Sequence, residues 1–408
     1  MEKDTTRLQL LLILDRLVRF VYISDDPSLL PLVIFRTLEW TRNYGINMFS
    51  STALVQAGII FTGGLNDLSG GASLAAAGLS LSQEKPELPI EVRSVYIAHG
   101  LVLCWSQPWR DQLKPLLRAY DIGLRIGDTE SACWDIFHYV LFRFLSGTSL
   151  DLLVTDTRVY RAQCQELQHI YIGLQVAIYS QVFINLSGDT DDVLALYGDA
   201  LSESEIKSWR DHDNAFEGVY NTLQGYIYTM YGEHLQCAKL ALKHGVTAII
   251  KQLPASPIGY IEIYSKGVSC FAAARETGHR RYLKLGRQAH KVIKGWIEQG
   301  CPNVSYYDAL LEAEYAACQG RKFLARQKYD IAIVISGRTG LLLDAGFAAE
   351  RLGEYLLDIG EPKDDALFQL KRAHQYYSEI GAHGKVSQLL RRHSGLVSLP
   401  EQIVAPRI

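Results

Sequence analysis

The sequence predicts an all-α protein built from tandem helical hairpins, stacked as an α-solenoid with a right-handed superhelix. Apolar residues recur at spacings of three and four along almost the whole chain, which is the pattern of helices with a buried face. No stretch sustains the two-residue alternation of a strand, so we expect no sheet. Glycine and proline stand between periodic segments, as they do between the two helices of a hairpin.

The helical pattern is clearest in two consecutive C-terminal segments. Their apolar stripes are Leu341, Leu342, Ala345, Ala349, Leu352 and Leu356, then Ala366, Leu370, Ala373 and Tyr377. Between the stripes lie Gly360 and Pro362. Glycine is common just past a helix and proline in the first turn of the next, so this punctuation predicts a hairpin.

Three hairpins share the spacing of a tetratricopeptide (TPR) repeat. The repeated positions are Gly320, Ala325, Tyr329 and Ala332, then Gly360, Ala366, Leu370 and Ala373, and upstream Gly225, Tyr228, Gly232, Ala238 and Ala241. Small residues allow two helices to approach closely, and aromatic residues fill the space to the next hairpin. We therefore expect the alanines to lie at the seams between helices.

Weaker copies of the pattern occur upstream, around residues 50–79 and 116–132. The clearest break lies at 253–259, which contains two prolines. The expected units are an N-terminal helical segment (1–34), an N-terminal helical-repeat array (35–252), C-terminal TPR-like repeats (260–392) and a loose tail (393–408).

Composition excludes several classes of protein. The 408 residues carry a formal net charge of −3, so no global field attracts nucleic acid or an anionic membrane. The seven cysteines are odd in number and include no Cys-x-x-Cys pair, which indicates reduced thiols and a cytoplasmic location. Residues 43–66 and 167–188 lack formal charge but contain Gln, Asn and Ser, so we expect buried helices rather than membrane spans.

No catalytic, cofactor-binding or metal-ligating motif is present in the sequence. A nucleotide-binding loop needs a lysine after its glycines, and the glycine-rich segments 63–71 and 337–340 lack one, so both are interpreted as hairpin loops. The acidic pairs are interpreted as helix N-terminal acids favoured by the macrodipole. These pairs are Asp25-Asp26, Asp191-Asp192 and Asp364-Asp365.

Aromatic residues are the most unusual feature, with 23 tyrosines and six tryptophans. Most are expected to fill space between helices. Trp209 lies in the polar stretch 207–214 and is expected to be exposed. Together with Arg210 and His212 it forms the predicted partner-binding site.

An ordered series of residues resembles a known family. The series is Trp296, Cys301-Pro302-Asn303, Leu310 to Glu314, Gly320, Tyr329 to Ala332, Gly346-Phe347, Glu350, Gly360, Ala373, Tyr376-Tyr377, Gly381-Ala382 and Lys385-Val386. It resembles the TPR-like region of very large signalling proteins that combine a protein kinase-like domain, an AAA-type ATPase of the STAND class and a C-terminal histidine kinase or cyclase.

The resemblance covers roughly residues 35–392. It departs at Ile380, where the family usually has tryptophan, and around Gly337–Thr339, which is loopier than the family pattern. The ATPase and kinase domains are not in this sequence, so the resemblance implies only the fold and a regulatory, interaction-bearing role.

Three functional hypotheses remain open from the sequence. The first is a non-catalytic scaffold or regulatory module that binds a protein partner, such as an ATPase or kinase domain, without a cofactor. The second is an all-α enzyme with a cavity inside the superhelix, which a deep polar pocket with converging ionisable groups would favour. The third is a separated fragment of a larger ATPase-kinase.

Overall fold

The computed structural model describes residues 5–24, 27–83 and 89–393. Within these ranges the regular structure is entirely helical, without a strand, so the all-α prediction is confirmed. The predicted tail falls outside the described residues from position 394 onward, as does the pair Asp25-Asp26.

The α-helices follow one another along the chain with short connections. In order they are α1 (Thr5–Ile23), α2 (Leu30–Tyr44), α3 (Ser50–Ile59), α4 (Leu68–Ser82), α5 (Pro89–Ile97), α6 (Trp109–Ile126), α7 (Thr129–Leu145), α8 (Leu150–Glu166), α9 (Ile170–Ser187), α10 (Glu203–Arg210), α11 (Asn214–Met230), α12 (His234–His244), α13 (Ala248–Gln252), α14 (Ile258–Thr277), α15 (Arg280–Glu298), α16 (Ser305–Cys318), α17 (Lys322–Arg338), α18 (Leu342–Asp358), α19 (Lys363–Ile380) and α20 (His383–Arg392). Short 3₁₀ segments are η1 (Pro27–Leu29) and η4 (Leu103–Trp105), and π-helical segments are η2 (Ile60–Gly64) and η3 (Ala98–Val102).

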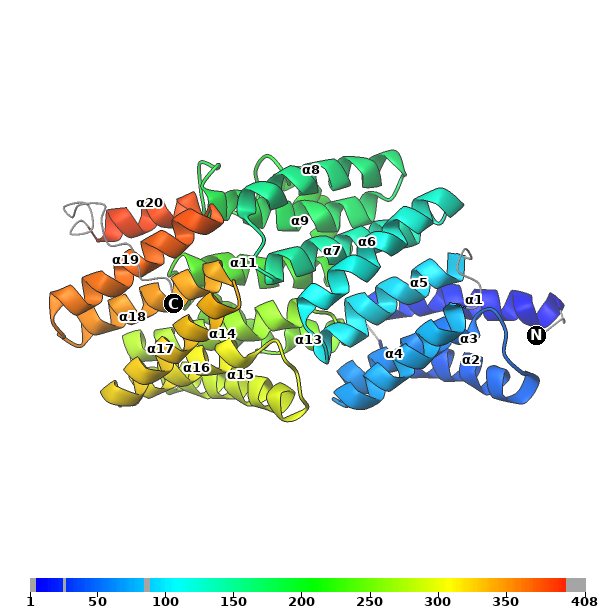
Figure 1. The fold of residues 1–408 in the computed structure, drawn as a ribbon, viewed down its shortest axis with the longest axis horizontal. Coiled ribbons are helices and arrows are strands. Elements are labelled where there is room, and N and C mark those ends of the chain that lie inside the picture. The colour runs from blue at the N-terminus through cyan, green and yellow to red at the C-terminus, as the bar shows by residue number, and fades with distance from the viewer. Residues whose placement is uncertain (1–4, 25–26, 84–88, 394–408) are drawn as a thin grey trace.

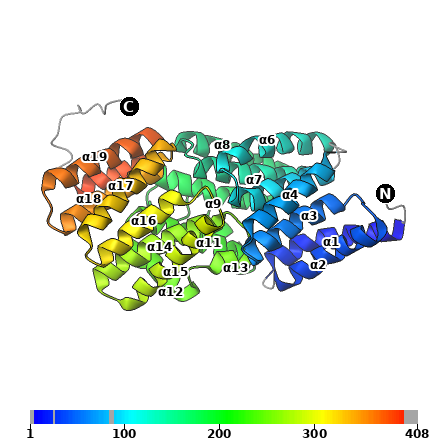
Figure 2. The ribbon, with the colours of Figure 1, turned by 60° about the horizontal axis from the view of Figure 1, so that its bottom comes forward.

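Helices that are neighbours in sequence pack as pairs. The closest pairs are α3 with α4, α6 with α7, α8 with α9, α14 with α15, α16 with α17 and α18 with α19. Figure 1 shows α1 to α4 at one end of an elongated molecule and α18 to α20 at the other. Figure 2, turned by 60°, keeps the same two ends apart. This packing is compatible with a stack of hairpins.

The C-terminal hairpins follow the predicted pattern closely. The stripe Ala366, Leu370, Ala373 and Tyr377 is fully buried, as are the seam residues Ala325 and Ala332. A methyl group at Gly353 of α18 would come within 2.7 Å of Leu370 on α19, so the seam requires a small residue there. Gly360 has a φ of +74°, a backbone conformation that favours glycine. Pro362 is the N-cap of α19, one residue earlier than predicted.

Segments from the two predicted repeat arrays share one hydrophobic core, which runs from Val18 to Leu389. Trp105 stacks on Tyr260 with 4.2 Å between ring centroids, and its ring lies 5.0 Å from that of Trp296. Asn303 donates from Nδ2 to the carbonyl oxygen of Cys104 at 2.9 Å. The break at 253–259 therefore joins two parts that pack against each other.

The uncharged segment 167–188 is a core helix, as predicted. It forms α9, which is buried continuously from Ile172 to Ser187. Among the described residues α9 is the one helix whose length and apolar character would allow it to cross a membrane, yet 89% of its 18-residue window is buried inside the protein. In the other uncharged segment α3 is buried, whereas Asn43 to Ile46 are exposed.

One loop prediction and one helix N-terminus prediction were wrong. The glycine-rich segment 63–71 is mainly helical, because η2 continues to Gly64 and α4 begins at Leu68. Asp191 and Asp192 lie in the long loop between α9 and α10, where the Asp192 carboxylate accepts the amide of Leu194 at 2.9 Å, rather than at a helix N-terminus. Asp364 and Asp365 do lie in the first turn of α19, as predicted.

Candidate functional site

A cavity of about 690 Å³ lies in the N-terminal half of the molecule. Its walls come from α1, α3, α5, η3, α7, α9, α10, α11 and the loops that lead into α9, α11 and α14. This volume falls within the range of small-molecule binding sites. No sequence motif indicated the cavity, because its walls come from segments spread over more than 200 residues.

Two helices each present one face to the cavity. On α7 this face includes Trp134, Phe137, His138 and Leu141, and on α1 it includes Asp15, Val18, Arg19 and Tyr22. Both sets follow the spacing i, i+3, i+4, i+7, which places side chains on one side of a helix. The same spacing describes a core stripe, so periodicity alone cannot separate a cavity wall from a packed interface.

Aromatic rings form a continuous wall across the cavity. The ring of Trp134 lies 6.4 Å from that of Tyr96 and 6.2 Å from that of Tyr171, measured between centroids. Tyr171 in turn lies 5.3 Å from Trp209, and Phe137 lies 5.7 Å from Tyr179. These are the separations at which aromatic side chains interact favourably.

Irregular backbone surrounds the cavity. The π-helical segments η2 and η3 directly follow the wall residues Ile59 and Ile97, and π-helical turns occur frequently at functional sites. Ala255, beside the wall residues Leu253 and Ser256, has a φ of +63°. Its carbonyl accepts the indole N–H of Trp105 at 2.8 Å, which holds the loop in place.

Glycine at position 63 is required where η2 meets this loop. A Cβ atom there would lie 2.4 Å from the backbone nitrogen of Ala255 and 2.8 Å from the carbonyl carbon of Pro254. Both neighbours are backbone atoms, so a side chain could be accommodated only if the loop moved. Gly63 therefore allows the close approach of the loop that carries the wall residues Leu253 and Ser256.

The charged side chains of the cavity wall are mostly paired with each other. Arg93 forms an ion pair with Asp15, and Arg19 forms one with Glu130. Burial raises the pKa of Asp15, although Arg93 and Arg19 act in the opposite direction. Loss of solvation therefore outweighs the attraction of two guanidinium groups, which indicates that the wall is strongly desolvated at Asp15.

His138 is neutral in this environment. Its Nδ1–H donates to the carbonyl oxygen of Trp134 at 2.8 Å, and burial lowers its pKa to about 4. Its ring lies 6.2 Å from that of Tyr96, almost parallel to it. His138 thus contributes a flat, uncharged surface to the aromatic wall.

The predicted partner-binding residues do not form one exposed patch. Trp209 is half-buried and lies in the cavity wall, so the expectation that it is exposed was wrong. Arg210 pairs with Glu217 at 3.2 Å and lies over the ring of Tyr220. His212 is exposed in the turn after α10. The tryptophan turns inward because α10 packs its aromatic side chain against Tyr171 of α9.

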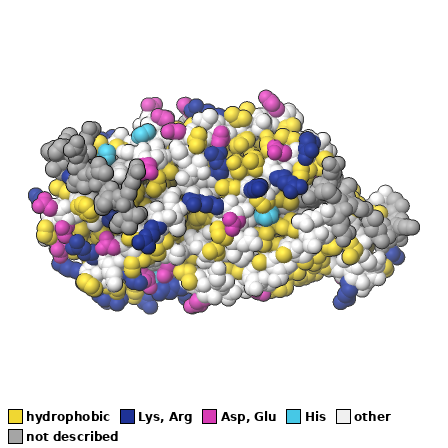
Figure 3. Space-filling model, viewed as in Figure 1, with side chains coloured by type: hydrophobic (Ala, Val, Ile, Leu, Met, Phe, Trp, Pro, Cys, Tyr) yellow, Lys and Arg dark blue, Asp and Glu magenta, His cyan; other side chains and the backbone are white. Residues whose placement is uncertain are grey.

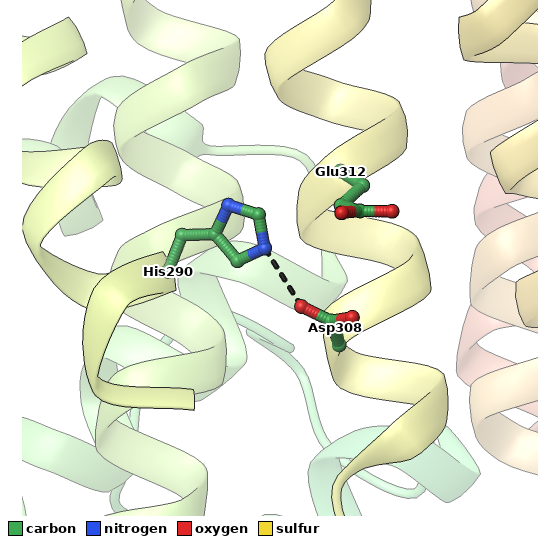
Figure 4. A group of neighbouring side chains, drawn as sticks. All are labelled: His290, Asp308 and Glu312. Atoms are coloured by element: carbon green, nitrogen blue, oxygen red, sulfur yellow. Dashed lines mark hydrogen bonds and ion pairs between the residues drawn. The ribbon is translucent and has the colours of Figure 1, made fainter. Parts of the chain in front are cut away.

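A second group of side chains brings together His290, Asp308 and Glu312 from α15 and α16 (Figure 4). Nε2 of His290 lies 2.8 Å from an oxygen of Asp308. The Glu312 carboxylate is paired with Lys294 at 3.1 Å and with Lys328. One histidine and two carboxylates could hold a divalent ion, but two ammonium groups oppose a cation here. We interpret the group as an ion-pair cluster that links α15, α16 and α17.

Neither protein-family models nor curated proteins match this chain in sequence.

Proposed function

We propose that this chain is a non-catalytic helical-repeat module that binds an apolar small molecule in the cavity between α1 and α7. The observation that carries the proposal is the cavity itself, about 690 Å³ with a continuous aromatic wall. Concave, mainly apolar sites with a few fixed polar groups are typical of small-molecule binding. The π-helical turns beside the cavity support a functional role, because irregular backbone has a cost that regular packing would avoid.

Binding is favoured over catalysis by the state of the ionisable groups. An enzyme would be expected to present an acid, a base or a nucleophile to its substrate. In this cavity Asp15 and Glu130 are each paired with an arginine, and the N–H of His138 is held by a carbonyl group. These contacts leave the groups in structural roles.

The test is binding of Nile red, a neutral apolar dye whose fluorescence rises in a dry environment. We expect saturable binding of one dye per chain. Ser256→Phe should abolish it, because Ser256 lies in the cavity wall and a phenyl group would occupy the space. Ser378→Phe is the matched control, because Ser378 is exposed on α19, at the end opposite α1. Equal binding to both variants would contradict the proposal.

A second function, the protein-binding scaffold expected from the sequence, is favoured by an exposed apolar stripe on α1. The stripe consists of Leu10, Ile13, Leu17 and Phe20, and Ile13 and Phe20 are 61% and 64% exposed. Phe20 also lines the cavity. Terminal repeats of a soluble solenoid usually carry a polar outer face. A helix with apolar residues at this spacing suits an apolar groove of a partner protein.

The charge of the surface around the stripe indicates which kind of partner would bind there. Arg16 and Arg42 are exposed on α1 and α2, as is Arg36, which pairs with Glu39 at 2.6 Å. Figure 3 shows apolar and basic side chains on the visible face at the α1–α4 end. We therefore propose a protein partner with an apolar groove and an acidic rim, consistent with the regulatory role that the resemblance implies.

This second proposal is tested by capturing partners from native extract with the wild-type chain and with Ile13→Asp, followed by identification of the bound protein. A partner with an acidic surface should be retained by wild type and by the control Ser378→Asp, and lost with Ile13→Asp. Self-association detected by light scattering, and lost with Ile13→Asp, would instead identify a second copy as the occupant.

A further inference from the structure

We infer that the ligand of the α1–α7 cavity is a neutral, largely aromatic molecule, and that the paired charges of the wall exclude ionic ligands. This inference rests on the proposed small-molecule binding and specifies the class of the ligand. It follows from three features of the wall: the pairing of its charges, its desolvation and its aromatic surface.

The first feature is the pairing of charges. Arg93 is held by Asp15 and Arg19 by Glu130, so each guanidinium group already has a carboxylate partner. Asp213, the remaining acidic group of the wall, caps α11 and accepts the amide of Phe216 at 3.0 Å. The positive end of the α11 dipole stabilises this carboxylate. An ionic ligand would therefore have to compete with an existing pair for its counter-ion.

The second feature is the desolvation of the wall. Burial lowers the pKa values of His138 and His169, which disfavours positive charge, and raises that of Asp15, which disfavours negative charge. Negative charge is thus penalised at Asp15 on α1, and positive charge is penalised at His138 on α7 and at His169. A ligand that carried a charge into this space would meet the same penalty. Among the wall residues, Nε of Arg19 is the one buried side-chain donor without a hydrogen-bond partner in the described structure.

The third feature is the aromatic surface. Rings of Tyr96, Trp134, Tyr171 and Trp209 follow one another across the cavity, and Phe137 and His138 extend the same surface. Aromatic rings prefer offset-stacked or edge-to-face contacts with other rings. An aromatic ligand gains these contacts in addition to burial of apolar surface, and a saturated ligand of equal size does not.

The experiment compares four bicyclic probes of similar size by displacement of Nile red at pH 7. They are 2-naphthalenemethanol, which is neutral, 2-naphthoate, which is anionic, 2-naphthylmethylammonium, which is cationic, and decahydronaphthalene-2-methanol, which is neutral and saturated. We expect the neutral aromatic probe to bind at least about tenfold more tightly than either ionic probe, and more tightly than the saturated one.

A variant tests whether the pairing of charges causes the preference for the neutral probe over the ionic probes. Glu130→Gln removes the carboxylate charge that pairs with Arg19 and leaves this guanidinium group without its ion pair. The affinity ratio of 2-naphthoate to 2-naphthalenemethanol should rise about tenfold or more. Asp156→Asn is the matched control, because it frees Arg143 on the same helix α7 but outside the cavity. It should leave the ratio unchanged.

The outcomes separate this inference from the proposed function. Nile red that binds and is excluded by Ser256→Phe establishes a small-molecule site, whatever the probes do. The inference is overturned if an ionic probe binds as tightly as 2-naphthalenemethanol, if the saturated probe matches it, or if Glu130→Gln leaves the ratio unchanged. Absence of Nile red binding would overturn both.

Discussion

Lys385→Met should open the contact between α20 and the centre of the molecule. Lys385 is fully buried, and its ammonium group lies 2.9 Å from a carboxylate oxygen of Glu350 on α18. The same group donates to the carbonyl oxygen of Met230 at the end of α11 and to Gln388 at 2.5 Å. One side chain therefore joins three helices.

The free-energy cost of Lys385→Met arises mainly from the Glu350 carboxylate, which remains without its ion pair. Burial lowers the pKa of Lys385, so the contacts of the ammonium group do not fully offset its loss of solvation. Glu350 is only 3% exposed, and without Lys385 it would keep a single hydroxyl donor, Tyr377, at 2.6 Å. Removing one member of a buried pair typically costs about 3–5 kcal/mol. The double variant Lys385→Met/Glu350→Gln should cost clearly less, because no charge is left unpaired.

Hydrogen exchange measures this effect locally. In Lys385→Met the amides of α20 and of the end of α11 should lose protection by about 3–5 kcal/mol in opening free energy. Arg326→Met is the control, because Arg326 and Asp365 form a pair at 3.0 Å with both side chains 45% exposed. Such exposed pairs contribute about 0–1 kcal/mol. Similar losses in the two single variants, or a double variant as unstable as Lys385→Met, would refute the reasoning.

Three further outcomes are expected from packing and burial. Ala332→Leu should overpack the seam beside α17 and lower the free energy of unfolding by about 1–3 kcal/mol. Amide exchange should become faster in the C-terminal hairpins, while the N-terminal half stays protected. Uniform loss of protection along the chain would contradict a repeat-like response. Gly384→Ala should lower the melting temperature, because the added Cβ would lie 2.5 Å from the hydroxyl of Tyr231. Gly295→Ala in α15 should raise the melting temperature or leave it unchanged, because the added Cβ would meet no atom within 4 Å. Asp135 is fully buried without a hydrogen-bond partner in the described structure, and burial holds its pKa well above the usual range. The folded state therefore binds its proton more tightly than the unfolded chain, and its contribution to stability is lost as pH rises from about 4. Asp135→Asn should remove this loss, measured as a gain in melting temperature that is larger at pH 8 than at pH 4; an equal shift at both pH values would contradict it.

The C-terminal hairpins could be predicted from sequence because their signals are local. Ala366, Leu370, Ala373 and Tyr377 recur at helical spacing, and all four are buried in α19 as expected. The one-face description failed for α18, which is buried on nearly all sides, including Glu350 and Arg351. Partners more than 30 positions away, Lys385 and Glu314, make their burial possible.

The cavity could not be predicted because no local pattern distinguishes its wall from packed core. Trp134, Phe137, His138 and Leu141 have the spacing of any buried helical face. Trp209 was singled out from sequence, but for exposure in a polar stretch, and the structure turns it toward Tyr171 instead. The direction of a side chain on a short helix depends on what packs against that helix.

The sequence by itself determined the helical class, the punctuation of the C-terminal hairpins and the small residues of their seams. These features depend on backbone propensity and on spacing within one or two turns, which are properties of neighbouring residues. Tertiary structure decided where the packed helices leave a cavity. Gly63 meets the loop at Ala255, and α1 lies opposite α7, only because segments far apart in sequence are brought together. A cavity is the space that several packed surfaces leave between them, and no single segment encodes it.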